Sequence, residues 1–262
     1  MTAAKDDAIR AAAERLITAF DSGKPTDPVR DTVPDMTLDD AYAVQLLVQD
    51  ALVKRDGPVV GRKIGLTSKA MQKQLGVDSP DFGFLTEAMM HVGDSTVPAG
   101  NFISPKVEPE FAFKLNTRLA GPGVTREQAV AAIESVHAAI EIIDSRVKDW
   151  NIRLVDTVSD NASCGAVVLG GEALDVDPDN LLDVACSIVI DGAELASGTG
   201  ADVLGDPIEP LVWLANILGE RGAAIEAGDV VIPGSFTAAQ VVQAGSTATA
   251  DFGDLGKVSV TF

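Results

Sequence analysis

The sequence has 262 residues, of which 46% are hydrophobic and 5% aromatic, enough for one large domain or for a domain with a helical appendage. Its 20 basic and 39 acidic residues give a formal net charge of −19, which argues against attraction to nucleic acid or to an anionic membrane. No apolar run approaches the ~20 residues of a membrane helix, and the acidic start MTAAKDDAIR is unlike a signal peptide. Two cysteines are too few for a disulfide framework. We therefore expect a cytoplasmic protein.

Two amphipathic helices are predicted near the N-terminus. Residues 5–20 are rich in alanine and place apolar side chains at helical spacing. The stretch TLDD, residues 37–40, has the form of a capping box, and the helix that it starts is expected to end at Gly57-Pro58, because the residue before a proline is disfavoured in the helical conformation. A third, short helix is predicted over residues 69–75.

Two candidate polar residues lie in the region between these helices and residue 83. Residues 59–66, VVGRKIGL, predict a strand interrupted by two glycines with Lys63 between them. Lys63 is either a buried cation that binds an oxyanion or donates a proton, or a lysine that reaches solvent from a strand edge. Residues 77–83, VDSPDFG, predict a turn-rich loop, in which Asp81 is a catalytic carboxylate or a turn residue after a proline.

Three glutamates form the candidate metal site. Residues 104–115, SPKVEPEFAFKL, predict a strand that places Glu108 and Glu110 on one face, roughly 6–7 Å apart. Two carboxylates this close call for a proton or a divalent metal, although a solvated strand face is the alternative. Glu141 lies in the apolar run AAIEIIDS, where an isolated carboxylate is costly. Oxygen ligands of this kind suit Mg²⁺ or Mn²⁺ better than zinc.

The stretch before Glu141 predicts a helix that starts at residues 125–128, TREQ, with Val130, Ile133 and Val136 on its inner face. The β-branched density that follows indicates that this helix ends near His137. We therefore reject His137 and Glu141 as a pair of metal ligands on one helical face.

The second half of the chain offers one polar run of interest. Residues 153–165, RLVDTVSDNASCG, could line a pocket or form a capped surface loop. Ser163 is not predicted to be a nucleophile, because no G-x-S-x-G elbow surrounds it and no histidine is placed to serve it. A helix is predicted over residues 207–218, and strands over residues 184–190, 230–236 and 257–262.

Several ordered motifs together resemble the 2-keto-4-pentenoate hydratase and 4-oxalocrotonate decarboxylase group of the fumarylacetoacetate hydrolase superfamily. The resemblance covers nearly the whole chain. The matching stretches are GRKIGLTS, GVDSPDFGFL, PKVEPEFAF, AIEIIDSR, RLVDTVSDNAS, DPIEPLVWLAN and PGSF.

The resemblance implies an α+β fold, a mostly β rolled mixed sheet with a helical N-terminal part, which we divide into residues 1–75 and a catalytic domain of residues 76–262. It also implies homo-oligomers with a Mg²⁺ or Mn²⁺ site and a small-molecule substrate. Carried over by position, the metal ligands are Glu108, Glu110 and Glu141, the catalytic residues are Lys63 and Asp81, and the substrate-binding residues are Ser163, Leu66 and Ser235.

The implied reaction is the metal-dependent addition of water to a 2-hydroxyalka-2,4-dienoate of the 2-oxopent-4-enoate type, giving a 4-hydroxy-2-oxoalkanoate in the meta-cleavage degradation of aromatic compounds. The alternative is decarboxylation of a 4-oxalocrotonate-type acid, for which Arg62, Lys69 or Lys106 could supply a cation to the second carboxylate. The loop PDFG, residues 80–83, favours the hydratase. A catalytically silent member that binds a 2-oxo acid, or a partner in a complex with a related decarboxylase, is the remaining reading.

Overall fold

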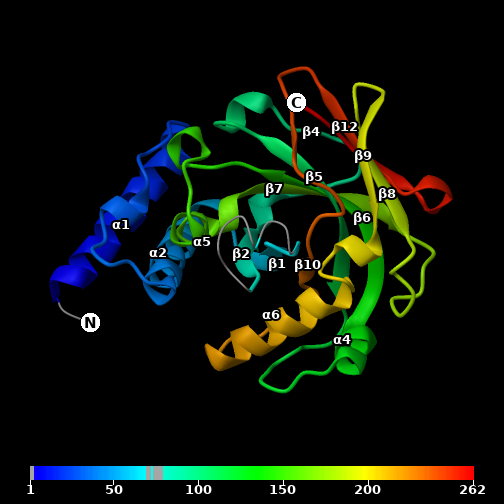
Figure 1. The fold of residues 1–262 in the computed structure, drawn as a ribbon, viewed down its shortest axis with the longest axis horizontal. Coiled ribbons are helices and arrows are strands. Elements are labelled where there is room, and N and C mark those ends of the chain that lie inside the picture. The colour runs from blue at the N-terminus through cyan, green and yellow to red at the C-terminus, as the bar shows by residue number, and fades with distance from the viewer. Residues whose placement is uncertain (1–2, 69–71, 73–78) are drawn as a thin grey trace.

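A large mixed β-sheet forms the centre of the molecule in the computed structural model, which describes residues 3–68, 72 and 79–262 (Figure 1). The strand order is β2-β1-β10-β5-β6-β7-β3, and β11 pairs with β5 beside this path. The pairs β1–β10 and β3–β7 are parallel, whereas β5, β6 and β7 are antiparallel neighbours. The strands are β1 (Val59–Gly65), β2 (Asp81–Thr86), β3 (Met90–Val92), β5 (Lys106–Leu115), β6 (Ile133–Ile143), β7 (Cys164–Ala173), β10 (Val230–Ile232) and β11 (Gln240–Val241).

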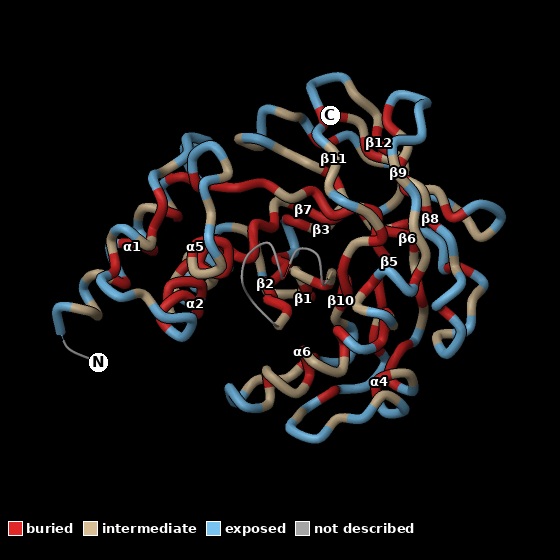
Figure 2. The backbone as a smooth tube through the Cα atoms, viewed as in Figure 1, coloured by how far each residue is buried: buried red, intermediate tan, exposed pale blue. Residues whose placement is uncertain are grey.

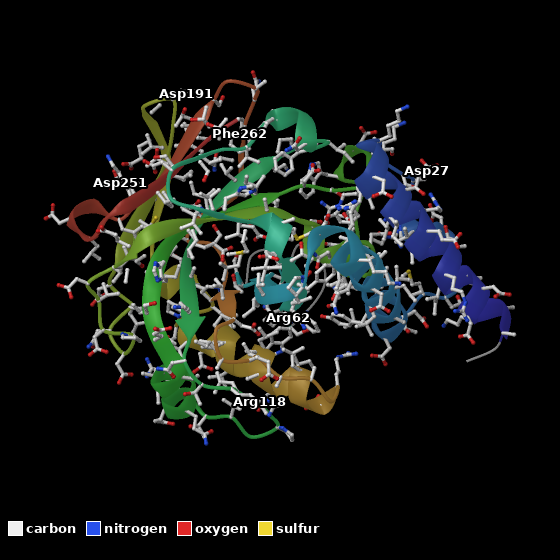
Figure 3. The ribbon with its side chains drawn as sticks, turned by 180° about the vertical axis from the view of Figure 1, so that it is seen from behind. Asp27, Arg62, Arg118, Asp191, Asp251 and Phe262 are labelled. Atoms are coloured by element: carbon white, nitrogen blue, oxygen red, sulfur yellow. The ribbon has the colours of Figure 1, made fainter. Side chains whose placement is uncertain are left out.

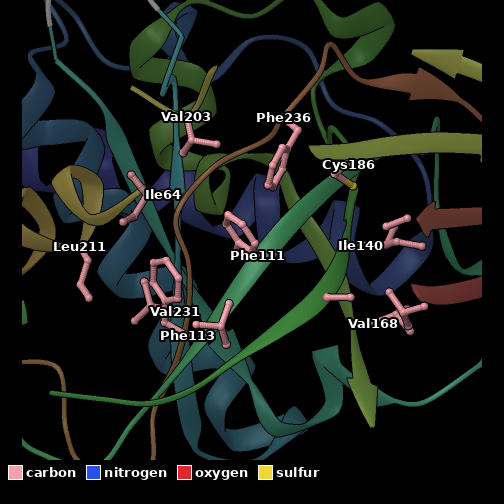
Figure 4. Packing of buried hydrophobic residues seen from close by; sticks show 14 of the residues in the cluster. Ile64, Phe111, Phe113, Ile140, Val168, Cys186, Val203, Leu211, Val231 and Phe236 are labelled. Carbon is pink, nitrogen blue, oxygen red and sulfur yellow. The ribbon is translucent and has the colours of Figure 1, made fainter. Parts of the chain in front are cut away.

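A second sheet packs against one face of β5 and β6. Its order is β4-β13-β12-β8-β9, with bounds β4 (Ser95–Thr96), β8 (Ala185–Ile190), β9 (Ala193–Thr199), β12 (Thr247–Asp251) and β13 (Lys257–Thr261). The core between the sheets contains the rings of Phe111 and Phe236, whose centroids lie 4.7 Å apart (Figure 4). The Phe252 ring lies 5.5 Å from that of Phe111. Because side chains alternate along a strand, the odd-numbered residues of β5 enter this core and the even-numbered ones face the other way.

Helices surround the sheets. The pair α1 (Ala3–Ser22) and α2 (Leu38–Asp56) forms an arm with its own apolar core at one side of the molecule, and α6 (Ile208–Glu220) and α4 (Arg126–Ala132) lie together at another side (Figure 1). The short α5 (Leu154–Ser159) packs on α2. Short 3₁₀ segments span Val29–Asp31, Glu87–Met89, Ala99–Asn101, Lys148–Trp150, Asn161–Ser163, Gly200–Asp202 and Gly253–Leu255.

The N-terminal helices confirm the sequence prediction. Thr37 caps α2 in a capping box with Asp40, and the helix ends at Gly57, whose φ of 86° is a conformation that L side chains rarely adopt. The chain then enters β1, which lies within the large sheet between β2 and β10. The predicted α+β fold with a rolled mixed sheet is thereby confirmed, while the division at residue 75 stays a prediction.

Two local predictions are corrected by the structure. The helix that starts after Thr125 ends at Ala132, and Ile133 and Val136 belong to β6, because pairing with β5 and β7 overrides the helical pattern. His137 is therefore a strand residue, with its ring between the Ser135 hydroxyl and the Gly170 carbonyl. The segment predicted as a loop at residues 77–83 becomes strand β2 from Asp81 onward.

Two further predictions concern a short helix after β1 and membrane-spanning helices. The helix predicted over residues 69–75 lies outside the described residues. Within the described ranges, no helix is long and apolar enough to cross a membrane. The central strands of the large sheet are deeply buried, and exposed residues gather in the loops and on the outer helix faces (Figure 2).

Candidate metal centre and active site

The three predicted glutamates converge on the even-numbered face of β5. Glu108 and Glu141 are direct partners in the antiparallel register of β5 and β6, and Glu110 follows two residues along on the same face. One oxygen of each carboxylate lies within 4.8 Å of the others. Glu110 and Glu141 are buried and Glu108 is partly exposed. Two strands that are separated in the sequence thus bring three carboxylates to one place.

Apolar packing closes one side of the carboxylate site. Beyond Glu110 on the same face of β5, the strand continues with Ala112, which packs with Ala139, Val167 and Ile232 in a separate apolar cluster. These side chains come from four neighbouring strands and are buried. The carboxylates therefore stand at the end of a water-poor surface, where charge is costly without compensation.

The protein supplies too few hydrogen bonds to offset the burial and mutual repulsion of these carboxylates. Burial, followed by repulsion from Glu141, raises the pKa of Glu108 to about 7, and the same two causes raise the pKa of Glu110. Glu110 accepts one hydrogen bond, from the Gly234 backbone N–H at 2.8 Å. Both carboxylate oxygens of Glu141 are buried without a hydrogen-bond partner among the described residues. An all-oxygen donor set with unpartnered atoms fits a hard divalent cation.

Lys63 is the buried cation of the site rather than a lysine that reaches solvent. It is 4% exposed, donates to the Ala162 carbonyl at 3.0 Å and lies 3.3 Å from Glu141 Oε1. Burial opposes its charge, but the carboxylates of Glu141 and Asp81 outweigh burial and raise the pKa of Lys63 above its usual value. Lys63 therefore remains protonated at neutral pH.

Asp81 lies beside Lys63 at the start of β2. It is opposite Gly65 in the register of β1 and β2, and its buried Oδ1 has no hydrogen-bond partner in the described part of the chain. A Cβ on Gly65 would lie 2.3 Å from Asp81 Oδ1 and 3.1 Å from Lys63 Nζ, so any larger residue there would displace one of these two side chains. Burial raises the pKa of Asp81, against the opposing charge of Lys63.

The three predicted substrate-binding residues lie near the glutamates, Lys63 and Asp81, and they differ in the contacts that they already make. The Ser163 hydroxyl is buried and lies 3.0 Å from that of Thr157. Leu66 follows β1 in the left-handed conformation, with a φ of 57°, and its carbonyl accepts a hydrogen bond from the side chain of Gln72. Ser235 forms a bridge with Glu110 but donates its hydroxyl to the Pro109 carbonyl at 3.3 Å.

The turn before Ser163 carries residues whose structural roles the sequence did not reveal. Asn161, Ala162 and Ser163 are all left-handed, with φ values of 53°, 49° and 56°, a conformation that costs non-glycine residues free energy. Asn161 holds the turn against β2, because its side chain accepts from the Phe84 N–H at 2.8 Å and donates to the Phe84 carbonyl at 2.9 Å. The turn thereby aims the Ala162 carbonyl at Lys63.

Burial also decides between the two interpretations of residues 153–165, a pocket lining and a capped surface loop. Residues 156–163 are buried without exception, so the run is not a surface loop. Beneath the turn, Asp160 forms an ion pair with Arg146 at 2.5 Å, and the Arg146 guanidinium lies over the Phe20 ring of α1 at 4.2 Å. The polar composition of residues 153–165 pointed to this region in the sequence. Only the tertiary contacts show that its polar side chains are buried and paired rather than exposed on a surface loop.

Fold and site together define an enzyme with a candidate site for a divalent metal. The chain belongs to the fumarylacetoacetate hydrolase family, whose C-terminal model matches residues 60–262. It is 42% identical over 259 residues to a 2-keto-4-pentenoate hydratase of Burkholderia vietnamiensis, covering 98% of each chain. It is 40% identical over 251 residues to a 2-hydroxyhexa-2,4-dienoate hydratase of Comamonas testosteroni, covering 95% of each chain.

A solved structure of similar shape is the 4-oxalocrotonate decarboxylase of Pseudomonas putida G7 in complex with magnesium and adipate. It has a TM-score of 0.94 and is 33% identical, covering 100% of this chain and 99% of the decarboxylase. A second structure of that decarboxylase contains calcium and acetate. A relative of the same overall shape thus binds divalent cations, in agreement with the donor set formed by the three glutamates.

Proposed function

We propose that this protein is a metal-dependent hydratase that adds water to a 2-hydroxyalka-2,4-dienoate and forms a 4-hydroxy-2-oxoalkanoate. The observation that carries the proposal is the convergence of three carboxylates, with both oxygens of the buried Glu141 lacking a hydrogen bond among the described residues, beside the ammonium of Lys63 and the buried Asp81. About 40% identity to dienoate hydratases over nearly the full chain supports the choice of reaction.

Glu108, Glu110 and Glu141 would hold the metal ion, which we propose to be Mg²⁺ or Mn²⁺. Such an ion supplies a positive charge that orients the carboxylate and the neighbouring oxygen of a 2-oxo acid and stabilises negative charge as it develops there. The chain contributes an anionic face with a closed apolar floor, which excludes water from one side of the bound acid.

Lys63 and Asp81 would then divide the proton chemistry. Lys63 stays charged, so it stabilises an oxyanion or donates a proton to it and does not act as a base. Asp81 has a free buried oxygen and a raised pKa, which suits a group that positions water or exchanges a proton with the substrate carbon. Ser163 would hydrogen-bond the substrate, while Thr157 holds its hydroxyl in place.

A decarboxylase is the second candidate, because the decarboxylase from Pseudomonas putida G7 has the same overall shape at a TM-score of 0.94. Separate assays with 2-hydroxypenta-2,4-dienoate and 4-oxalocrotonate, following loss of dienol absorbance and release of CO₂, distinguish the two reactions. We expect metal-dependent loss of the dienol. Rapid release of CO₂ from the diacid would overturn the proposal, and no turnover of either acid would favour a silent binding protein.

The ligand assignment has its own test. Glu110→Gln keeps the shape of the side chain and an oxygen for the Gly234 N–H, so we expect a folded protein that loses most of its activity. Normal turnover by this variant would contradict the assignment. We also propose that the protein is cytoplasmic and that it assembles into a homo-oligomer or with a related decarboxylase.

A further inference from the structure

The turn of residues 160–163 is held at both ends by the chain that directly follows β6. At the first end, three N–H groups of Arg146 donate to Asp160. The backbone N–H donates to Oδ2 at 2.9 Å, Nε to Oδ1 at 2.5 Å and Nη2 to the carbonyl oxygen at 2.8 Å. At the other end, the Asp144 backbone N–H donates to the Ser163 carbonyl at 2.8 Å. The turn is therefore fixed by a segment far from it in the sequence.

This turn carries two groups of the candidate active site. The Ala162 carbonyl accepts a hydrogen bond from the Lys63 ammonium at 3.0 Å, and Ser163 carries the hydroxyl that we expect to bind substrate. The Ser163 N–H donates at 2.9 Å to the Asp160 carbonyl, the same oxygen that accepts from Arg146 Nη2. Because three successive residues of the turn are left-handed, the turn would relax if these contacts were lost.

The helical arm holds Arg146 in turn. Arg146 is 2% exposed, and its guanidinium lies 4.2 Å from the centroid of the Phe20 ring, near the end of α1. The connector after α1, in which Asp27 lies beside the arm (Figure 3), also binds the Arg146 backbone, because the Thr26 N–H donates to its carbonyl at 2.8 Å. One arginine thus connects the N-terminal arm to the turn at the active site.

A second buried ion pair in the same polar run shows what is particular to Arg146. Arg30 donates its backbone N–H to Asp156 Oδ1 at 3.0 Å and forms an ion pair with Oδ2 of the same carboxylate. That pair holds α5, before the turn. Both pairs remove charges from water, and such desolvation offsets much of their attraction. Only the pair of Arg146 with Asp160 acts directly on the turn that contacts Lys63.

We propose that Arg146 is a positioning residue, whose guanidinium acts through Asp160 to fix the turn that orients the Lys63 ammonium and the Ser163 hydroxyl. The side-chain hydrogen bonds recorded for Arg146 in the described ranges all go to Asp160, so the guanidinium acts through this residue. The inference rests on the proposed function only for the roles of Lys63 and Ser163.

A cavity beside the guanidinium allows a rescue experiment. The cavity has a volume of about 260 Å³ and is lined in part by Arg146, Phe20 and Phe102. Arg146→Ala would join the space of the missing side chain to this cavity. Because the turn relaxes, kcat for the dienoate should fall about tenfold or more. Guanidinium chloride at tens of millimolar should then raise kcat about fivefold or more, whereas methylammonium, which lacks the planar fork of donors, should not.

Arg30→Ala is the matched control, because it removes an arginine from the other buried ion pair of this region. It should lower the free energy of unfolding in urea titrations, as Arg146→Ala should, but kcat should change by less than about twofold and should not respond to guanidinium. A loss of kcat that accompanies lost stability equally in both variants would overturn the inference.

Calorimetry with 2-oxopentanoate, an unreactive acid, provides a readout that does not depend on turnover. Arg146→Ala should weaken its binding to the magnesium-loaded protein about threefold or more, through the displaced Ser163 hydroxyl, and guanidinium should restore the affinity. The inference is overturned if kcat and affinity both remain at the wild-type values, or if guanidinium restores neither.

Asp160→Asn decides the question if Arg146→Ala does not fold. It keeps the size of the side chain and the backbone carbonyl but removes the charge that the guanidinium holds, so kcat should still fall about fivefold or more, and an unchanged kcat overturns the inference. An affinity for 2-oxopentanoate that depends on Arg146, in a protein that hydrates no dienoate, would refute the proposed reaction and leave this inference intact.

Discussion

Glu108→Gln should change stability in opposite directions with and without metal. In the metal-free protein, burial and repulsion from Glu141 raise the pKa of Glu108 from 4.5 to about 7. The raised pKa in the folded state means that its contribution to stability is present below pH 4.5 and is lost as pH rises through 7. At pH 8 the ionised group costs about 3–4 kcal/mol, because its pKa rises from 4.5 to about 7 and each pH unit corresponds to ~1.4 kcal/mol.

Replacing the glutamate with glutamine removes this cost, and no hydrogen bond is recorded for the Glu108 side chain in the described ranges. In chelator at pH 8, the variant should therefore be more stable by up to about 3–4 kcal/mol, or roughly 6–16 °C in melting temperature for a chain of this size. With magnesium at 100 times its dissociation constant, the wild type gains about 2.7 kcal/mol, and the variant, short of one ligand, gains less.

Thermal unfolding at pH 5 and pH 8, with chelator and with magnesium, measures both effects. At pH 5 in chelator the advantage of the variant should shrink, because Glu108 is then mostly protonated in the folded protein. Glu134→Gln makes the same change at a half-exposed site of β6 and should shift the melting temperature little in all four conditions. If Glu108→Gln destabilises the protein equally with and without metal, the reasoning from crowded carboxylates is wrong.

Two further substitutions test the supports of the site. Gly65→Ala would press a methyl group against Asp81 and Lys63, so kcat should fall by at least about tenfold while magnesium affinity, measured by calorimetry, changes little; unchanged kcat would refute the close approach. Asn161→Ala leaves the Phe84 N–H and carbonyl without partners and should lower the free energy of unfolding by about 2–4 kcal/mol in urea titrations, and a loss below about 0.5 kcal/mol would show that the clamp is dispensable.

The sequence by itself determined the local features. Strand alternation places Glu108 and Glu110 on one face whatever the rest of the fold does, and the capping box at Thr37 with the stop at Gly57 sets the limits of α2. These inferences depend on neighbours within a few residues. Together with the ordered motifs, they were enough for the fold class and for the three candidate metal ligands.

Tertiary structure decided everything that depends on partners distant in the chain. Residues 133–137 read as the end of a helix but became strand, because pairing with β5 and β7 outweighs a weak helical pattern. The register of β5 on β6 sets Glu141 opposite Glu108, and the register of β1 on β2 sets Asp81 opposite Gly65. Whether Lys63 is buried follows from these long-range pairings, which local sequence periodicity does not encode.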